Sequence, residues 1–259
     1  MLFDSHIHTE FSADSEMKAA DALAMAEKQG IGLVFTEHLD AHYVSKDGKT
    51  FSFAPHAYWQ AYSRLRGDKL RLGVEIGMRA NTRDFSEEFS RRVPFDMIIC
   101  SQHLVDDIDI YYPDYYEGKD KQEAYHRYFV QMAQNLKVHS FANALGHIDY
   151  ICRYAPYDNP DIVYEDFADE IDAVLKTAIV TDTVMELNTR RLGAKDALAK
   201  LAPIYRRYKE MGGHFVTLGS DAHDVDAVGA HLQLACDFAE SLGLRPVTFC
   251  QQRMVNCLK

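Results

Sequence analysis

The sequence predicts an α/β protein, a TIM-like barrel of seven strand–helix units, with the active site at the C-terminal ends of the strands. Short apolar runs alternate with helical patterns seven times, and no linker, repeat or low-complexity stretch interrupts them. Histidine and acidic residues recur where the apolar runs end. Such alternation is typical of parallel βαβ units, and six to eight units can close a barrel. We therefore expect one domain over residues 1–259.

Strands are expected where apolar or alternating runs are short and end in polar residues. The run at 31–36 is continuously apolar, as in strands that are buried on both faces of a parallel sheet. The seven predicted strands lie within residues 1–10, 31–36, 70–77, 95–101, 142–147, 180–188 and 214–220.

Helices are expected between these strands, where apolar residues recur at a spacing of three to four. Gly30 and the Gly212-Gly213 pair are placed to end two of them. A polar loop is expected at 42–52, and a long irregular insertion rich in Asp and Tyr at 105–121. Loops of that length usually carry function. The tail at 245–259 is not assigned. The predicted helices cover residues 18–29, 55–66, 86–92, 123–138, 161–178, 195–211 and 225–242.

Composition narrows the class of protein and its compartment. A net charge of -11 argues against a nucleic-acid surface, which normally needs a basic stripe. No apolar run reaches the length of a membrane span, and the first residues enter a strand without a signal segment. The five cysteines are odd in number and include no Cys-x-x-Cys, which indicates reduced thiols. We expect a cytoplasmic protein, without nucleic-acid or membrane partners, that is a monomer or small homo-oligomer.

The candidate metal ligands follow the predicted strands. His6 and His8 are two residues apart in the first strand, so both rings should point to one side. Taken singly, His38 or His103 could be an ordinary hydrogen-bonding residue, and Asp221 could cap a helix. Together they favour a multinuclear site of imidazole and carboxylate ligands, which suits Zn, Fe or Mn. The nine candidates are His6, His8, Asp14, His38, Glu75, His103, His147, Asp221 and His223.

The order of these motifs resembles the polymerase and histidinol phosphatase (PHP) superfamily, and within it the histidinol-phosphate phosphatases. The pattern runs from His6-x-His8 through Glu37-His38, then Glu75 and His103, to Gly146-His147 and Asp221-x-His223, and it covers essentially the whole chain. The insertion at 109–119 resembles the same branch, though it is less specific. The resemblance implies a distorted barrel of seven strands and three divalent metal ions.

The resemblance also implies how the ligands divide among the three metals. The first would be held by His6, His8, Glu75 and Asp221, and the second by Glu75, as a bridge, with His103 and His147. The third would be held by Asp14, His38 and His223. Some relatives have His at the place of Asp14, whereas the phosphatase branch has Asp.

The activity that we expect is hydrolysis of L-histidinol phosphate in histidine biosynthesis, by a hydroxide held between metals that attacks phosphorus. Glu75 and Asp221 would be catalytic through the metals. Arg153 and Arg190 are placed to grip the phosphate, whereas Arg191 should point elsewhere. His42 could orient the substrate or act as the leaving-group acid.

Two other readings stay open. The chain could be a PHP phosphoesterase for another small substrate such as a nucleotide, because the insertion and the arginines shape the leaving-group pocket. It could also be a non-catalytic PHP domain that supports a polymerase. The full set of nine donors and the lack of a basic surface argue against that last reading.

Overall fold

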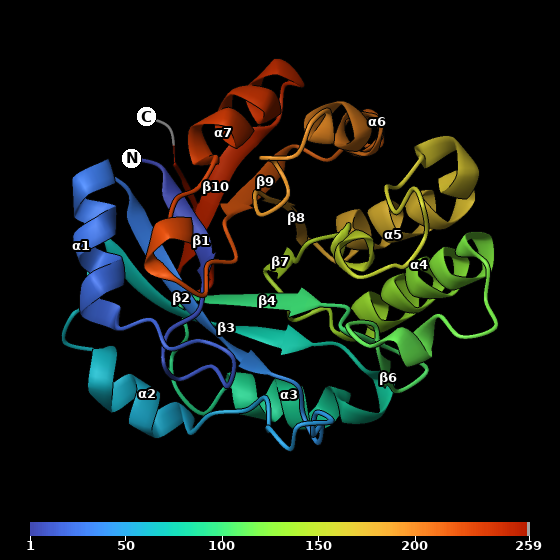
Figure 1. Ribbon diagram of the computed structural model, residues 1–259. Coiled ribbons are helices and arrows are strands. Elements are labelled where there is room, and N and C mark those ends of the chain that lie inside the picture. The colour runs from blue at the N-terminus through green and yellow to red at the C-terminus, as the bar shows by residue number, and fades with distance from the viewer. Residues whose placement is uncertain (258–259) are drawn as a thin grey trace.

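A nine-stranded, mostly parallel sheet forms the centre of the molecule in the computed structural model, which describes residues 1–257 (Figure 1). Every neighbouring pair in it is parallel except the last, β10–β11. A separate two-stranded hairpin joins β5 (Leu104–Val105) to β6 (Ile108–Asp109). The strands of the large sheet, in order, are β1 (Phe3–Ile7), β2 (Gly32–Leu39), β3 (Leu70–Gly77), β4 (Met97–Ser101), β7 (Ala144–Leu145), β8 (Val184–Asn188), β9 (Phe215–Gly219), β10 (Arg245–Cys250) and β11 (Arg253–Asn256).

Helices surround the outer face of the curled sheet (Figure 1). The α-helices are α1 (Ala19–Gln29), α2 (Pro55–Tyr62), α3 (Arg83–Ser90), α4 (Lys121–Val138), α5 (Ala168–Val180), α6 (Ala197–Glu210) and α7 (Leu232–Ser241). Single 3-10 turns are η1 (Ala80–Thr82), η2 (Pro113–Tyr115), η3 (Tyr150–Arg153), η4 (Tyr164–Phe167) and η5 (Val225–Ala227). Gly30 ends α1, as the sequence predicted, and adopts the left-handed conformation with φ of 70°.

The sheet curls until its first strand meets the residues that follow β9. The His8 amide donates to the Ala222 carbonyl at 2.9 Å, and the Asp221 amide donates to the His6 carbonyl at 2.8 Å. β10 pairs with β9 only where both strands begin, and there Arg245 lies opposite Phe215. The α/β fold is confirmed, and these two bonds bring the C-terminal ends of β1 and β9 to one place.

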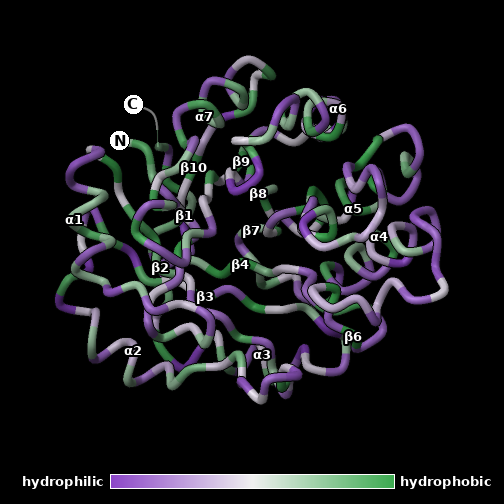
Figure 2. Tube along the Cα trace, viewed as in Figure 1, coloured by the Kyte–Doolittle hydropathy of each residue, from purple (hydrophilic) through white to green (hydrophobic). Residues whose placement is uncertain are grey.

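Two apolar clusters pack against the two faces of the sheet. The larger fills the space between strands and helices, whereas the smaller lies on the inner face. In β2, Val34 belongs to the inner cluster and His38, four residues on, shares its face. Figure 2 shows hydrophobic stretches along the central strands and hydrophilic ones over the outer helices and loops. The inner cluster therefore closes the barrel beneath the polar residues at the strand ends. It consists of Phe3, Val34, Met97, Ile99, Ala144, Val184, Val247, Phe249 and Cys257.

Several predicted elements differ from the structure. The expected helix at 161–178 becomes α-helical only at Ala168, because residues 164–167 form η4. The expected strand at 180–188 begins only at Val184, because α5 continues to Val180 and Asp182, with φ of 57°, turns the chain. The expected helix at 225–242 is interrupted at Gly229, with φ of 69°, so α7 covers only its second part. The unassigned tail forms β10 and β11, and its residues 258–259 lie outside the described part.

No helix within residues 1–257 is both long and apolar enough to cross a membrane. The five cysteines, all in this part of the chain, are free thiols.

Candidate metal centre

Four of the predicted ligands meet where β1, β3 and β9 end. The Nε2 atoms of His6 and His8 lie 3.1 Å apart, so both rings converge on one point. Glu75 Oε2 lies 3.3 Å from His6 Nε2 and 3.5 Å from His8 Nε2. Asp221 Oδ1 lies 3.4 Å from His8 Nε2 and 3.8 Å from His6 Nε2. Ligands that share one zinc ion lie about 3.3–3.5 Å from each other, so this spacing suits a metal.

A second group forms on the other oxygen of the same carboxylate. Glu75 Oε1 lies 2.9 Å from Nε2 of His147, which follows β7, and 3.3 Å from Nε2 of His103, which follows β4. Glu75 is fully buried in the middle of both groups. One carboxylate therefore faces two donor groups, one on each oxygen.

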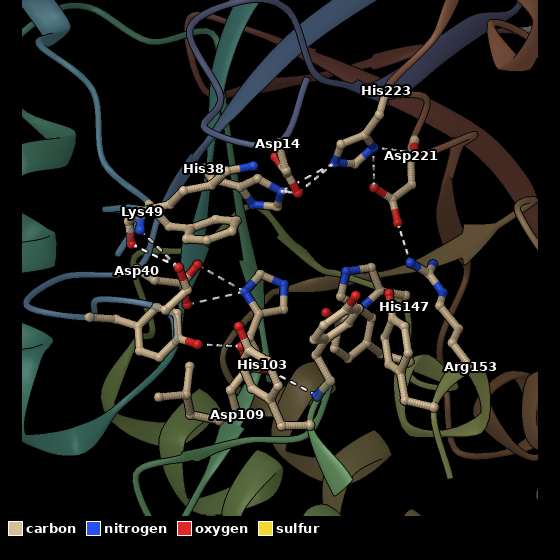
Figure 3. Close-up of a pocket in the computed structure, with 18 of the residues that line it drawn as sticks. Asp14, His38, Asp40, Lys49, His103, Asp109, His147, Arg153, Asp221 and His223 are labelled. Carbon is tan, nitrogen blue, oxygen red and sulfur yellow. Dashed lines mark hydrogen bonds and ion pairs between the residues drawn. The ribbon is translucent and has the colours of Figure 1, made fainter. Parts of the chain in front are cut away.

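A third group lies at the mouth of the barrel. Asp14 Oδ2 is 3.5 Å from His38 Nε2 and 3.2 Å from His223 Nε2, and those two nitrogens lie 3.4 Å apart. Figure 3 shows these three side chains pointing toward one another, with His103 and His147 on the opposite side of the pocket. All nine predicted donors are thus brought into three adjacent groups.

A bound cation would satisfy these donor atoms better than their hydrogen bonds to one another do. Glu75 Oε2 is buried and forms no aligned hydrogen bond with any described residue, although His38 Nδ1 lies 2.8 Å away. Leaving a buried carboxylate oxygen without a hydrogen bond in this way is costly. A divalent ion among these nitrogens and oxygens would satisfy them, and no thiol takes part, which favours a catalytic rather than a structural zinc-type site.

Buried carboxylates orient the histidine rings. His6 Nδ1 lies 2.7 Å from Glu186 Oε1, and because a carboxylate only accepts, the ring proton belongs on Nδ1. His103 Nδ1 lies 3.1 Å from both oxygens of Asp40, which gives the same assignment. In the neutral ring, each Nε2 then keeps a free lone pair that points to the centre of the site.

His8 is oriented through a hydroxyl group. Ser12 Oγ donates to Glu37 Oε2 at 2.6 Å, so its lone pairs are left to accept from His8 Nδ1 at 3.0 Å. His223 Nδ1 faces the Asp221 carbonyl at 2.9 Å. Arg190 Nη1, which can only donate, lies 3.3 Å from the same nitrogen of His223, so the proton is assigned for His8 alone, whose unprotonated Nε2 is the form that binds metal.

The carboxyl groups of Asp221 and Glu75 lie beside groups that favour their ionised forms. Burial alone would raise the pKa of the Asp221 carboxyl, but Arg153 and His6 beside it hold that pKa well below its usual range. Burial also opposes ionisation of Glu75, yet the rings of His6, His103 and His38 keep its pKa well below the ordinary value. Both carboxylates are therefore ionised near neutral pH, as metal ligands must be.

A cavity of about 340 Å³ opens above the ligands. Arg153 lies beside it with its side chain 8% exposed, and its Nη1 donates to Asp221 Oδ2 at 2.5 Å. Arg190, more exposed, donates from Nη1 to the Asp221 carbonyl at 3.1 Å. Two guanidinium groups therefore meet the ligand set at one rim of the cavity. Figure 3 shows Arg153 next to Asp221.

Two loops form the opposite wall. The loop after β2 contacts the predicted insertion through Tyr43, whose hydroxyl donates to Asp109 Oδ2 at 2.6 Å, and through Lys46, which pairs with Asp114 at 2.5 Å. The insertion, which the sequence predicted to be irregular, contains the hairpin of β5 and β6 and the turn η2. The lining there is mostly aromatic and acidic, with Asp109 and Tyr111 in the wall.

Two other predicted residues lie elsewhere. His42 is exposed, with its ring packed at 4.8 Å from the ring of Phe85, and it does not line the cavity. Its position argues against the expected role in substrate orientation or proton transfer. Arg191 turns away from the cavity to pair with Asp149 and Asp161. Arg191 was expected to point elsewhere than its neighbour Arg190, and it does.

Sequence reasoning missed three buried polar residues. Glu186 and Asp40 orient ligand rings, and Asn188 contacts both Glu186 and Arg153. The signal was available, because Asp40 lies two residues after His38, and Glu186 and Asn188 alternate along one strand. Residues at that spacing share a face of the strand, so polar side chains there reach the same interior.

Comparison with known proteins places this site in a family. The PHP domain family matches residues 4–190, which include seven of the nine donors. The chain belongs to the PHP domain family. The remaining described residues supply Asp221 and His223, which follow β9 of the same sheet.

Named relatives extend over nearly the whole chain. A probable histidinol-phosphatase of Clostridium acetobutylicum is 40% identical over 249 residues, which are 96% of this chain and 97% of that protein. A histidinol-phosphatase of Lactococcus lactis subsp. lactis is 30% identical over 227 residues, which are 85% of this chain and 83% of the relative.

A solved structure matches the fold closely. The crystal structure of histidinol phosphate phosphatase from Lactococcus lactis subsp. lactis, complexed with zinc, L-histidinol and phosphate, has a TM-score of 0.90 and 26% identity. The match covers 98% of this chain and 99% of that one.

Proposed function

We propose that this protein is a metal-dependent phosphatase that hydrolyses L-histidinol phosphate to L-histidinol and phosphate, a step of histidine biosynthesis. The observation that carries the proposal is the set of three donor groups around Glu75, with Arg153 and Arg190 at their rim. The relatives named histidinol-phosphatase and the similar structure with L-histidinol and phosphate support the choice of substrate.

Three metal ions would occupy the three groups. His6, His8, Glu75 and Asp221 would hold the first. Glu75, His103 and His147 would hold the second, and Asp14, His38 and His223 the third. Zinc is the first candidate because the similar structure contains it, and iron or manganese would suit the same donors. When bound, such ions supply Lewis acidity and a water of lowered pKa, which phosphate-ester hydrolysis needs.

The residues of this chain hold the phosphate and keep its surroundings ordered. Arg153 and Arg190 offer charged N–H donors at the rim, and an arginine fork matches two phosphate oxygens. Asp221 directs Oδ1 toward His6 and His8 and Oδ2 toward Arg153. The same carboxylate therefore sets the distance between the metal ligands and the guanidinium group that would bind the phosphate.

The wall of the two loops would receive the leaving group. Its tyrosine rings and carboxylates, including Tyr43 and Asp109, suit an alcohol that carries a ring and a positive charge. We further propose that residues 1–259 form a single domain, and that the protein acts in the cytoplasm as a monomer or small homo-oligomer without nucleic acid.

A screen of phosphate monoesters with purified, metal-analysed protein tests the proposal. The expected result is that L-histidinol phosphate has the highest kcat/KM, at least tenfold above nucleoside monophosphates and phenyl phosphate. A nucleotide as the best substrate would instead support the other phosphoesterase reading. No turnover of any ester by fully metallated protein would contradict a catalytic role altogether.

A further inference from the structure

Asn188, at the end of β8, is buried beneath the cavity and does not line it. The residue is only 4% exposed, yet both ends of its side-chain amide group form hydrogen bonds. Nδ2 donates to Glu186 Oε2 at 3.1 Å, and Oδ1 accepts from Arg153 Nη2 at 3.1 Å. The same oxygen accepts from the backbone amide of Arg190 at 3.1 Å. One side chain thus contacts both arginines of the rim.

The neighbours of Asn188 fix the direction of its amide group. A carboxylate can only accept and a guanidinium can only donate, so the reversed amide would face Glu186 and Arg153 with the wrong groups. Aspartate would supply the acceptor without the donor, and alanine would supply neither. The position therefore requires a short side chain with one donor and one acceptor.

Each neighbour of Asn188 leads to the first group of metal ligands. Glu186 Oε1 lies 2.7 Å from His6 Nδ1, while Arg153 Nη1 donates to Asp221 Oδ2 at 2.5 Å. His6 Nε2 lies 3.8 Å from Asp221 Oδ1, so the contacts form a closed ring of five side chains, each less than 9% exposed. The ring consists of His6, Glu186, Asn188, Arg153 and Asp221.

Arg153 has donors left over for a ligand. Asp221 and Asn188 engage one N–H on each Nη, so each Nη keeps a second N–H for a ligand. A single anchor at Asp221 would leave the guanidinium plane free to turn about that contact. A second anchor on the other Nη fixes the plane, which lowers the entropy lost when a phosphate is gripped.

We infer that Asn188 is a positioning residue. Its amide group links the guanidinium group of Arg153 to the Glu186 carboxylate, which contacts His6. This link would keep the guanidinium group that binds phosphate at a fixed position relative to the first metal group. The inference rests on the proposed phosphatase function. Its effect should be large for a residue that touches no substrate, since small misplacements of a binding group reduce rates strongly.

Two variants of Asn188 separate its donor contact from its two acceptor contacts. Asn188→Ala removes all three, whereas Asn188→Asp keeps the acceptor for Arg153 and Arg190 but sets a carboxylate against Glu186. Asn143→Ala is the matched control, because Asn143 Oδ1 accepts from the Ile98 amide at 2.8 Å at the far end of β7. The readouts are binding of inorganic phosphate by calorimetry, the rate of zinc loss to a chelator, the thermal midpoint, and kcat and KM on L-histidinol phosphate.

Asn188→Ala should weaken phosphate binding and raise KM by about tenfold, the size of one hydrogen bond to a charged group. Asn188→Asp should bind phosphate within about threefold of wild type and lose zinc faster. Asn143→Ala should lower the thermal midpoint and leave phosphate binding unchanged.

Phosphate binding within twofold of wild type in a folded Asn188→Ala protein would overturn the inference, and so would an equal loss in Asn143→Ala. If Asn188→Ala does not fold, Asn188→Asp decides: unchanged zinc retention would contradict the link to His6. A wild-type protein that binds phosphate but does not hydrolyse L-histidinol phosphate would contradict the proposed function and leave this inference standing.

Discussion

The Oε1 atom of Glu75 lies 2.9 Å from Nε2 of His147, and the other oxygen of the same carboxylate faces the rings of β1. Glu75 is fully buried, and no arginine or lysine pairs with it within residues 1–257. Its charge is therefore balanced by imidazole rings alone in the metal-free protein, and by cations when metals are bound.

Replacement of Glu75 by glutamine should remove metal and nearly all turnover. The substitution keeps the size of the side chain but removes the negative charge that two donor groups share. Metal content by elemental analysis and kcat on L-histidinol phosphate measure the effect. Glu88→Gln, at a carboxylate that is 72% exposed, is the control. Activity within tenfold of wild type, or about 1.4 kcal/mol of barrier, would show that Glu75 is a structural residue.

Replacement of Arg153 by alanine should lower kcat/KM by roughly 10- to 150-fold, the equivalent of ~1.5–3 kcal/mol for a charge-assisted hydrogen bond. Metal content should stay close to wild type, because Arg153 contacts Asp221 from outside the donor group. A raised KM with unchanged kcat would indicate ground-state binding of phosphate, whereas a lower kcat alone would indicate a contact made in the transition state. Arg245→Ala, at an exposed residue of β10, should change neither constant.

Replacement of Asp40 by asparagine should weaken metal binding by about 10- to 100-fold, the usual cost of losing a carboxylate behind a ligating histidine. Asp40 is buried and holds Nδ1 of His103, whereas Asp47, in the same loop, is exposed and pairs with Lys49. Competition with a chelator measures the affinity of each variant. Equal affinities for Asp40→Asn and Asp47→Asn would show that Asp40 does not orient the ring.

Stability should depend on pH through Asp96. Burial would raise the pKa of this carboxyl, but two bonds from Arg66, at 2.6 and 2.5 Å, and the amides of Leu72 and Gln251 outweigh burial and lower it. Since the folded pKa lies below the unfolded value near 3.9, the stabilisation is fully present above about pH 4 and is lost as pH falls through the folded pKa.

Asp96→Asn should therefore lower the free energy of unfolding by about 2 kcal/mol at pH 7, and the difference from wild type should shrink below about pH 4. Urea unfolding of the metal-free proteins from pH 7 to pH 3 measures it. Asp84→Asn, at a side chain that is 93% exposed, is the control. A difference that stayed constant down to pH 3 would mean that the charge of Asp96 contributes nothing.

The positions of the metal donors could be predicted because strand ends of a parallel sheet meet at one edge. His6, His38, Glu75, His103, His147 and Asp221 each lie in a strand or directly after one, so their order along the chain placed them together. The buried residues that orient these donors were harder to predict from the sequence. The spacing of Glu186 and Asn188 indicates that they share one face of their strand, but it does not indicate whether that face points to the site or to the helices, which the structure shows.

The hairpin of β10 and β11 was not predicted, because its turn lacks the residues that usually indicate one. Its turn consists of Gln251 and Gln252, both left-handed with φ of 52° and 58°, where Asn-Gly would be the usual signal. Pro246 within β10 also argues against a strand. Pro246 lies opposite Val216 and is the last residue of β10 that pairs with β9, so its missing N–H falls where that pairing ends.

A titration of metal-free protein with zinc, in which phosphate release from L-histidinol phosphate is followed at each addition, tests the proposed three-metal phosphatase function. That function predicts no turnover without metal and a rise that reaches its plateau near three equivalents per chain. Full turnover in the metal-free protein, or none at saturating zinc, iron and manganese, would contradict it.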